Sequence, residues 1–183
     1  YMRNIIAIIP ARGGSKGLKN KNILDLNGKP LLEWSIQFAR ENEFINECIL
    51  STDSEEIAGI GKKCGASVPF LREKSLATDT SKTSDVIIDV INKCNLDKKD
   101  LFVLLEPTSP FRLHRTFEKL LKYFDKNKFK KIVSVQECVS TSYRFQFFIN
   151  DTGELVPLNR SNFPNDLRRQ DIKKAFYLDG SFY

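Results

Sequence analysis

Short apolar runs alternate along the chain with stretches in which apolar residues recur every three or four positions. The runs at residues 5–9 and 101–105 are unbroken, which predicts central strands buried on both faces. Further short strands are predicted over residues 47–50, 67–71 and 132–136. Helical spacing predicts helices over residues 31–39, 55–63, 84–93 and 114–125. This alternation predicts an α/β, Rossmann-like fold with a mostly parallel central sheet and helices on both of its faces.

Residues that begin and end helices support these boundaries. Pro30 suits the first turn of the first helix, and Ser54 is placed to cap the second. Gly65 is placed to end that second helix. Trp34, on the first helix, is predicted to pack in the core.

The pattern changes after Glu137. Residues 143–149 are rich in aromatic side chains, residues 151–153 read Asp-Thr-Gly, and residues 154–158 are placed to pair back, which together predict a small β-hairpin. Residues 159–174 are polar, and residues 175–183 start another strand. A length of 183 residues supports one domain with a sizeable core.

The composition of the chain favours some partners and disfavours several classes of active site. A net charge of +6 favours anionic partners. The one histidine, His114, is predicted to be a surface residue at a helix start, which disfavours histidine metal sites and Ser-His or Cys-His hydrolases. The cysteines form no C-x-x-C pair, no apolar run approaches transmembrane length, and no signal peptide is visible. These features predict a cytoplasmic protein with reduced thiols and no membrane partner.

The most informative stretch is the loop over residues 10–22, which follows the first strand. It contains four cations separated by glycines: Arg12, Lys16, Lys19 and Lys21 are spaced by Gly13, Gly14 and Gly17. Glycines let backbone N–H groups approach a ligand closely, so the loop is suited to a polyanion such as a triphosphate. It matches neither the Walker pattern nor the dinucleotide fingerprint. A basic, flexible surface loop is the alternative, but ligands of open α/β sheets bind where this loop lies, at the carboxyl ends of strands.

Three other loops are expected at the same edge of the sheet, over residues 51–54, 72–83 and 106–113. Together with the loop over residues 10–22, these loops contain nearly all polar side chains with a predicted role. Taken singly, each has an ordinary explanation. Asp79 and Thr80 fit a helix cap, and residues 107–110 fit a plain turn. Their joint presence at one edge favours a binding site.

These motifs resemble the acylneuraminate cytidylyltransferases, the CMP-sialic acid synthetases. P-A-R-G-G-S-K-G-L-x-x-K-N after the first strand is similar to the first motif of that family, and L-L-E-P-T-S-P-F-R is similar to its L-L-Q-P-T-S-P-L-R. S-T-D-S-E-E-I-A, R-x-x-x-L-A-x-D-T and R-R-Q also match. The resemblance extends over essentially the whole chain and implies a single nucleotidyltransferase domain, with residues 137–174 as a hairpin and dimerisation insertion.

The resemblance also implies roles for individual residues. Arg12 and Lys21 would be catalytic. The nucleotide would be bound by Ala11, Arg12, Gly13, Ser15, Lys16, Lys21, Asn22, Arg72, Asp79 and Thr83. The sugar would be bound by Glu106, Thr108, Ser109, Arg169 and Gln170. The implied reaction transfers CMP from CTP to the anomeric hydroxyl of a nonulosonic (sialic-type) acid and releases pyrophosphate. The implied partners are CTP, an acidic nine-carbon sugar and a second copy of the chain.

The chain departs from the family pattern at two places. Glu106 stands where the family usually has Gln, and a carboxylate there would repel the carboxylate of an acidic sugar unless it meets a hydroxyl or amide. The aspartate pair that holds Mg²⁺ in the family is expected past Tyr183, so the domain is expected to lack its C-terminal part and to contain no metal ligands.

Three rival functions stay open from sequence alone. One is a nucleotidyltransferase for another sugar acid, and another is a nucleotide-binding module without turnover. The third is a nucleic-acid binder, which is supported only by the net charge. The basic residues disfavour it, because they lie in a tight glycine loop rather than along a stripe interleaved with exposed aromatic residues.

Overall fold

The computed structural model describes residues 3–14, 17–128, 130–138, 146–158 and 174–183. The chain divides into two compact units. The larger unit comprises Tyr1–Val133 together with Gly180–Tyr183, and the smaller one comprises Ser134–Asp179. Among the described residues, no helix is both long and apolar enough to cross a membrane.

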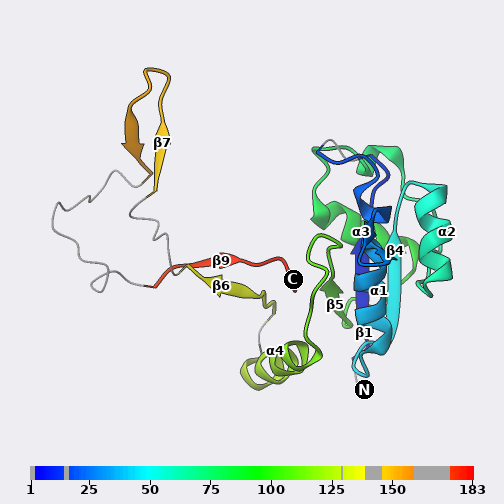
Figure 1. Ribbon diagram of the computed structural model, residues 1–183. Coiled ribbons are helices and arrows are strands. Elements are labelled where there is room, and N and C mark those ends of the chain that lie inside the picture. The colour runs from blue at the N-terminus through cyan, green and yellow to red at the C-terminus, as the bar shows by residue number, and fades with distance from the viewer. Residues whose placement is uncertain (1–2, 15–16, 129, 139–145, 159–173) are drawn as a thin grey trace. The chain divides into compact units, whose positions relative to one another are not determined.

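The larger unit is built on a three-stranded parallel sheet (Figure 1). Its strands are β4 (Glu47–Ser51), β1 (Ile5–Pro10) and β5 (Leu101–Leu104), in that spatial order. Ile8 of the middle strand is in register with Ile49 on one side and with Leu104 on the other. The N-terminal strand is therefore the centre of the sheet, and the loop that leaves it emerges between the ends of its two neighbours.

Helices form where helical spacing predicted them. They are α1 (Leu31–Glu41), α2 (Glu55–Lys63), α3 (Thr83–Lys93) and α4 (His114–Asn127), with short 3₁₀ turns at η1 (Lys21–Ile23) and η2 (Lys74–Leu76). The Ser54 hydroxyl caps α2 by accepting a hydrogen bond from the Ile57 N–H (3.4 Å). Gly65 follows α2 with a φ of +91°, a left-handed conformation that favours glycine. His114 is an exposed residue at the start of α4, as predicted.

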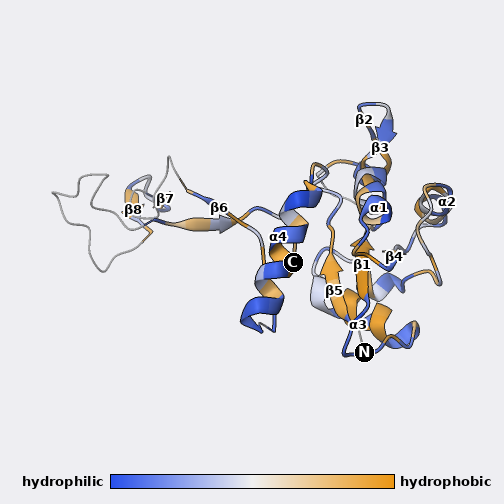
Figure 2. Cartoon of the chain, turned by 90° about the horizontal axis from the view of Figure 1, so that it is seen from below, coloured by the Kyte–Doolittle hydropathy of each residue, from blue (hydrophilic) through white to orange (hydrophobic). Residues whose placement is uncertain are grey.

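Helices cover both faces of the sheet, as the unbroken apolar strands predicted. Ala7 and Ile9 of β1 point into a cluster with α1, α2 and α4, whereas Ile6 and Ile8 point the other way, toward Val90 of α3. Figure 2 shows β1 and β5 as continuous hydrophobic strands. Successive side chains of a strand face opposite sides of a sheet, so only an unbroken apolar run can supply both layers.

Some of the predicted elements were wrong. No named strand forms over residues 67–71. There are only isolated bridges, from Ser67 to Ile49 and from Leu71 to Thr52. Pro69 lies between them and has no N–H to donate to a ladder. The strand predicted over residues 132–136 is shifted and shorter, at Val135–Glu137.

A further small hairpin was missed, and it explains the position of Trp34. Strands β2 (Asp25–Leu26) and β3 (Lys29–Pro30) pair ahead of α1. Trp34 is half-buried rather than in the core, because its Nε1 donates to the Leu26 carbonyl (3.1 Å) and its ring meets the edge of Phe111. An indole whose N–H finds a backbone acceptor commonly sits at such an edge position.

In the described part of the smaller unit, the strands form two antiparallel pairs. Strand β6 (Val135–Glu137) pairs with β9 (Phe176–Leu178), and β7 (Phe147–Ile149) pairs with β8 (Leu155–Pro157). The predicted hairpin is therefore confirmed where the chain is described, and Gly153 occupies its turn with a φ of +84°. Its role in dimerisation stays a prediction.

Candidate functional site

A cavity of about 280 Å³ opens at the carboxyl ends of β1 and β5. It is the place where the sequence predicted the polar loops to meet. Among the predicted residues, the cavity is lined by Arg12, Lys21, Asn22, Arg72, Asp79, Thr83, Glu106 and Thr108. Three of the four predicted loops, over residues 10–22, 72–83 and 106–113, thus share one space, whereas residues 51–54 do not line it.

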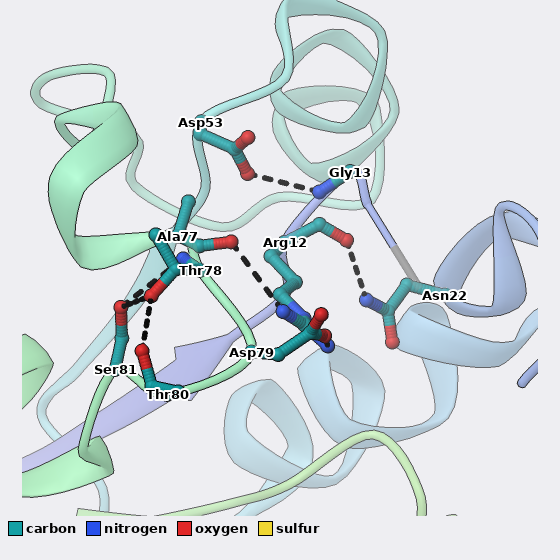
Figure 3. Close-up of polar contacts among 9 residues, drawn as sticks. All are labelled: Arg12, Gly13, Asn22, Asp53, Ala77, Thr78, Asp79, Thr80 and Ser81. Atoms are coloured by element: carbon teal, nitrogen blue, oxygen red, sulfur yellow. Dashed lines mark hydrogen bonds and ion pairs between the residues drawn. The ribbon is translucent and has the colours of Figure 1, made fainter. Parts of the chain in front are cut away.

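The loop over residues 10–22, called the phosphate loop after its predicted role, is held by side chains that bond to its backbone. The Asn22 side chain is buried, and its Nδ2 donates to the Arg12 carbonyl (3.0 Å), which ties the two ends of the loop together. The Gly13 N–H donates to Asp53 Oδ1 (2.9 Å), as Figure 3 shows. A Cβ at residue 13 would lie 3.1 Å from Ser54 Cβ, tighter than ordinary contact, so the glycine permits this close approach.

Arg12 bridges the phosphate loop and the loop over residues 74–81. Its Nη2 lies 2.5 Å from Asp79 Oδ1, and its Nη1 donates to the Ala77 carbonyl (3.4 Å) (Figure 3). Asp79 is therefore not a helix cap. The cap position of α3 is Lys82, which makes no side-chain capping bond. Both ion-pair side chains are about one-third exposed, so an incoming anion can reach the guanidinium.

Hydroxyl groups hold the same loop in shape. The Thr78 hydroxyl lies 2.7 Å from Ser81 Oγ and 3.2 Å from Thr80 Oγ1, and Ser81 Oγ donates to the Ser75 carbonyl (3.0 Å). Thr80 therefore also takes part in the loop rather than in a helix cap. Thr78 and Ser81 line the cavity, and the sequence analysis did not identify them. Their clustering with Thr80 and Thr83 in one loop was the available signal.

Arg72 is a buried cation in the wall of the cavity. The residue is 5% exposed, and its Nε has no hydrogen-bond partner among the described residues. Burial lowers the pKa of Arg72, and the nearby Arg12 lowers it further, whereas the charges of Asp53 and Asp89 act in the opposite direction. A buried donor without a partner is costly unless a ligand supplies an acceptor. Arg72 thus brings to this wall a guanidinium whose hydrogen bonds the described residues do not complete.

The loop after β5 also lines the cavity. Glu106 is half-buried and lines the cavity with Pro107 and Thr108. Ser109 is not part of the lining. Its N–H donates to the Glu106 carbonyl (3.1 Å), which closes a turn at the end of the strand.

The other predicted site residues are placed differently. Ala11 is fully buried, and its N–H donates to the Ser51 carbonyl (2.9 Å), so it supports the loop from within the core. Ser15, Lys16, Arg169 and Gln170 lie outside the described residues. Asp53 was not predicted as a site residue, although it lies two positions after the end of β4 in the predicted loop over residues 51–54.

Carboxylates at the site do not form a metal centre on their own. Within the described part of the chain, there is no group of three histidine, cysteine, aspartate or glutamate residues that could hold a metal ion. Asp79 is paired with Arg12, and Asp53 accepts from the Gly13 N–H. What the cavity gathers is cationic and hydrogen-bonding groups suited to a nucleoside triphosphate.

Comparison with known proteins places the chain in a family. A family model described as cytidylyltransferase matches residues 6–171. The chain belongs to the cytidylyltransferase family. The CMP-N,N'-diacetyllegionaminic acid synthase of Legionella pneumophila is 43% identical over 98% of this chain and 76% of its own length. The pseudaminic acid cytidylyltransferase of Campylobacter jejuni is 32% identical over all of this chain and 78% of its own length.

Solved structures of cytidylyltransferases confirm the Rossmann-like fold. A CMP:2-keto-3-deoxy-manno-octonic acid synthetase, solved with CTP, matches with a TM-score of 0.67. The match covers 98% of this chain and 73% of that one, at 19% sequence identity. It supports the α/β architecture and the parallel sheet.

Proposed function

We propose that this cytidylyltransferase transfers CMP from CTP to the anomeric hydroxyl of a nonulosonic acid. The hydroxyl oxygen forms a bond to the α-phosphorus, the bond from that phosphorus to the β-phosphate oxygen breaks, and pyrophosphate leaves. The hydroxyl proton is released to the medium. The named activities of the Legionella and Campylobacter relatives support this acceptor class.

We assign different parts of the substrates to different walls of the cavity. Lys21 and Arg12 stand on the loop that leaves the central strand, where they would neutralise the triphosphate and the charge that develops as pyrophosphate departs. Arg72 and Thr83 stand on the wall suited to the nucleoside, because the buried Arg72 side chain needs an acceptor and Thr83 offers a hydroxyl. The observation that carries the proposal is the meeting of these cations with Glu106 and Thr108 in one cavity.

The acceptor sugar is assigned to the wall formed by Glu106 and Thr108. An ionised Glu106 accepts hydrogen bonds and donates none, so it suits the N–H or O–H groups of a decorated nine-carbon sugar. Arg169 and Gln170 are proposed to join them on the strength of the family resemblance.

The resemblance implies Mg²⁺, but the described residues offer no ligand set for it. The steps proposed above therefore use only side chains of this chain. The proposed enzyme is a homodimer in the cytoplasm. Exposed apolar side chains on β7, Phe147, Phe148 and Ile149, support a subunit contact, which light scattering of the purified protein would test.

Two measurements test the function. Thermal shift with CTP, ATP, GTP and UTP should show a clear preference for CTP, since a ligand that binds only the folded state raises the melting temperature. Pyrophosphate release should then depend on an added nonulosonic acid, assayed with neuraminic, legionaminic and pseudaminic acids in turn. CTP binding without turnover on any of them would favour the binding-module alternative. Equal shifts with all four nucleotides would contradict the proposal.

A further inference from the structure

Arg112 is the centre of a hydrogen-bonded cluster just outside the cavity. It stands at the end of the loop that begins with Glu106. Its Nε donates to the Ser181 carbonyl (2.6 Å), its Nη1 to Ser35 Oγ (2.9 Å) and its Nη2 to the Glu106 carbonyl (2.7 Å). One side chain thereby joins helix α1, the end of β5 and the segment Gly180–Tyr183, all within the larger unit.

The Glu106 carbonyl is the shared hydrogen-bond acceptor of this cluster. Besides Arg112, it accepts from the Ser109 N–H (3.1 Å) and from the fully buried Ser35 hydroxyl (3.5 Å). These donors fix the backbone of the residue whose carboxylate lines the cavity. Arg112 itself does not line the cavity, so any effect it has on a ligand passes through this loop.

The segment at residues 180–183 is held against the same loop. A Cβ at Gly180, whose φ is +77°, would lie only 2.6 Å from Ser109 Oγ. Phe182 is buried beneath the Arg112 guanidinium, whose central carbon lies 6.0 Å from the ring centre, and it packs against Phe117. The Tyr183 carbonyl accepts from the Leu104 N–H (2.9 Å), so this segment runs beside β5.

We propose that Arg112 is a positioning residue for the acceptor sugar. It fixes the turn that carries Glu106 and Thr108 and leaves the nucleotide wall untouched. The inference rests on the proposed function, because it assigns the loop after β5 to the acceptor. A guanidinium suits the role, since its rigid fork meets several acceptors at once, whereas a lysine ammonium is a point charge on a flexible stem.

The test is kinetic and uses Arg112→Lys, with Arg115→Lys as the matched control. Arg115 is an exposed arginine in the first turn of α4, three positions after Arg112 in the sequence. Small displacements of positioning groups cost up to about 100-fold in rate. We expect R112K to lower kcat/KM for the preferred acid by about 10- to 100-fold, with the Kd for CTP changed less than twofold. R115K should change neither value.

A second variant guards against misfolding of the first. Ser35→Ala removes one partner of Arg112 and one donor to Glu106, and it should reproduce the direction of the R112K effect at smaller size. Equal losses of acid and CTP affinity in both variants would show a general structural role and overturn the proposal. Unchanged kcat/KM in R112K would also overturn it.

Amide hydrogen exchange separates this proposal from the proposed function. The Ser109 N–H should exchange faster in R112K than in the wild type and R115K, because its acceptor carbonyl is no longer held. If the wild type turns over no acid, the proposed function fails, and faster Ser109 exchange still supports the positioning of the loop by Arg112. Unchanged exchange would refute that positioning whatever the activity.

Discussion

Replacing Arg72 with methionine should separate binding from stability. Loss of a buried side chain at a binding site usually lowers both the ligand affinity and the stability of the protein. Arg72 differs, because it is 5% exposed and its Nε lacks a partner among the described residues. Burial lowers the pKa of Arg72, so its charged form is less favourable in the folded chain than in the unfolded one. Replacement of buried charged groups by apolar side chains of similar volume is often neutral or stabilising, and we expect the same of Arg72.

The expected loss of CTP affinity follows from the same geometry. A hydrogen bond to a charged group contributes about 1.5–3 kcal/mol, which corresponds to about 10- to 150-fold in Kd. We expect R72M to lose that much CTP affinity in calorimetry. Its melting temperature without ligand should stay within about 2 °C of the wild type or rise, since 1 kcal/mol corresponds to about 2–4 °C in a domain of this size.

A control with a structural arginine sharpens the result. Arg40 is exposed and donates to the Cys64 carbonyl (3.1 Å) at the end of α2, away from the cavity. R40M should leave the Kd for CTP unchanged. A fall of several degrees in the melting temperature of R72M, with CTP affinity intact, would refute the assignment and make Arg72 a structural residue.

Three further predictions concern single side chains. Lys21→Ala should reduce turnover by at least about 100-fold, the typical loss of one electrostatic contact to the transition state, with little change in melting temperature; unchanged turnover would remove Lys21 from the chemistry. Glu106→Gln should change the ratio of kcat/KM between two nonulosonic acids and leave CTP affinity nearly unchanged, whereas equal ratios would place Glu106 outside the sugar site. Burial raises the pKa of the Cys48 thiol to about 12, so iodoacetamide at pH 7.5 should label Cys48 only after unfolding in urea. Because the unfolded thiol ionises at lower pH than the buried one, Cys48 should also reduce stability as pH rises above about 9, and rapid labelling of the native protein would contradict its burial.

The central strands and helices α1 to α4 could be predicted because their signals are local. The run of isoleucines in β1 supplies both core layers, and Ser54 and Gly65 bound α2 by short-range chemistry. The predicted strand at residues 67–71 failed because propensity was given more weight than Pro69, which interrupts the ladder. The β2–β3 hairpin was missed because each strand has only two residues, too few to show a pattern.

The candidate site was also only partly predictable from the sequence. The phosphate loop could be found from its spacing of glycines and cations. The ion pair of Arg12 with Asp79 could not be predicted, because it joins residues 67 positions apart. A helix cap also explained Asp79 equally well from its neighbours in the sequence. The burial of Arg72 could not be predicted either, because a lone arginine before a polar loop is most simply a surface charge. The cluster around Arg112 depends on a serine of α1 and a carbonyl of the C-terminal segment, contacts that only the folded sheet brings together.

The central place of β1 in the sheet has a consequence for how the protein folds. Its pairing with β5 joins Ile5 to Leu101, whereas its pairing with β4 closes a loop less than half as long. Non-local pairings of this kind are slow, because the chain must lose loop-closure entropy before the contacts form. During synthesis the first strand therefore has only one partner until residues 101–104 have emerged. The cavity lined by both Arg72 and Glu106 cannot be complete before that moment, so the capacity to bind CTP should arise late in folding.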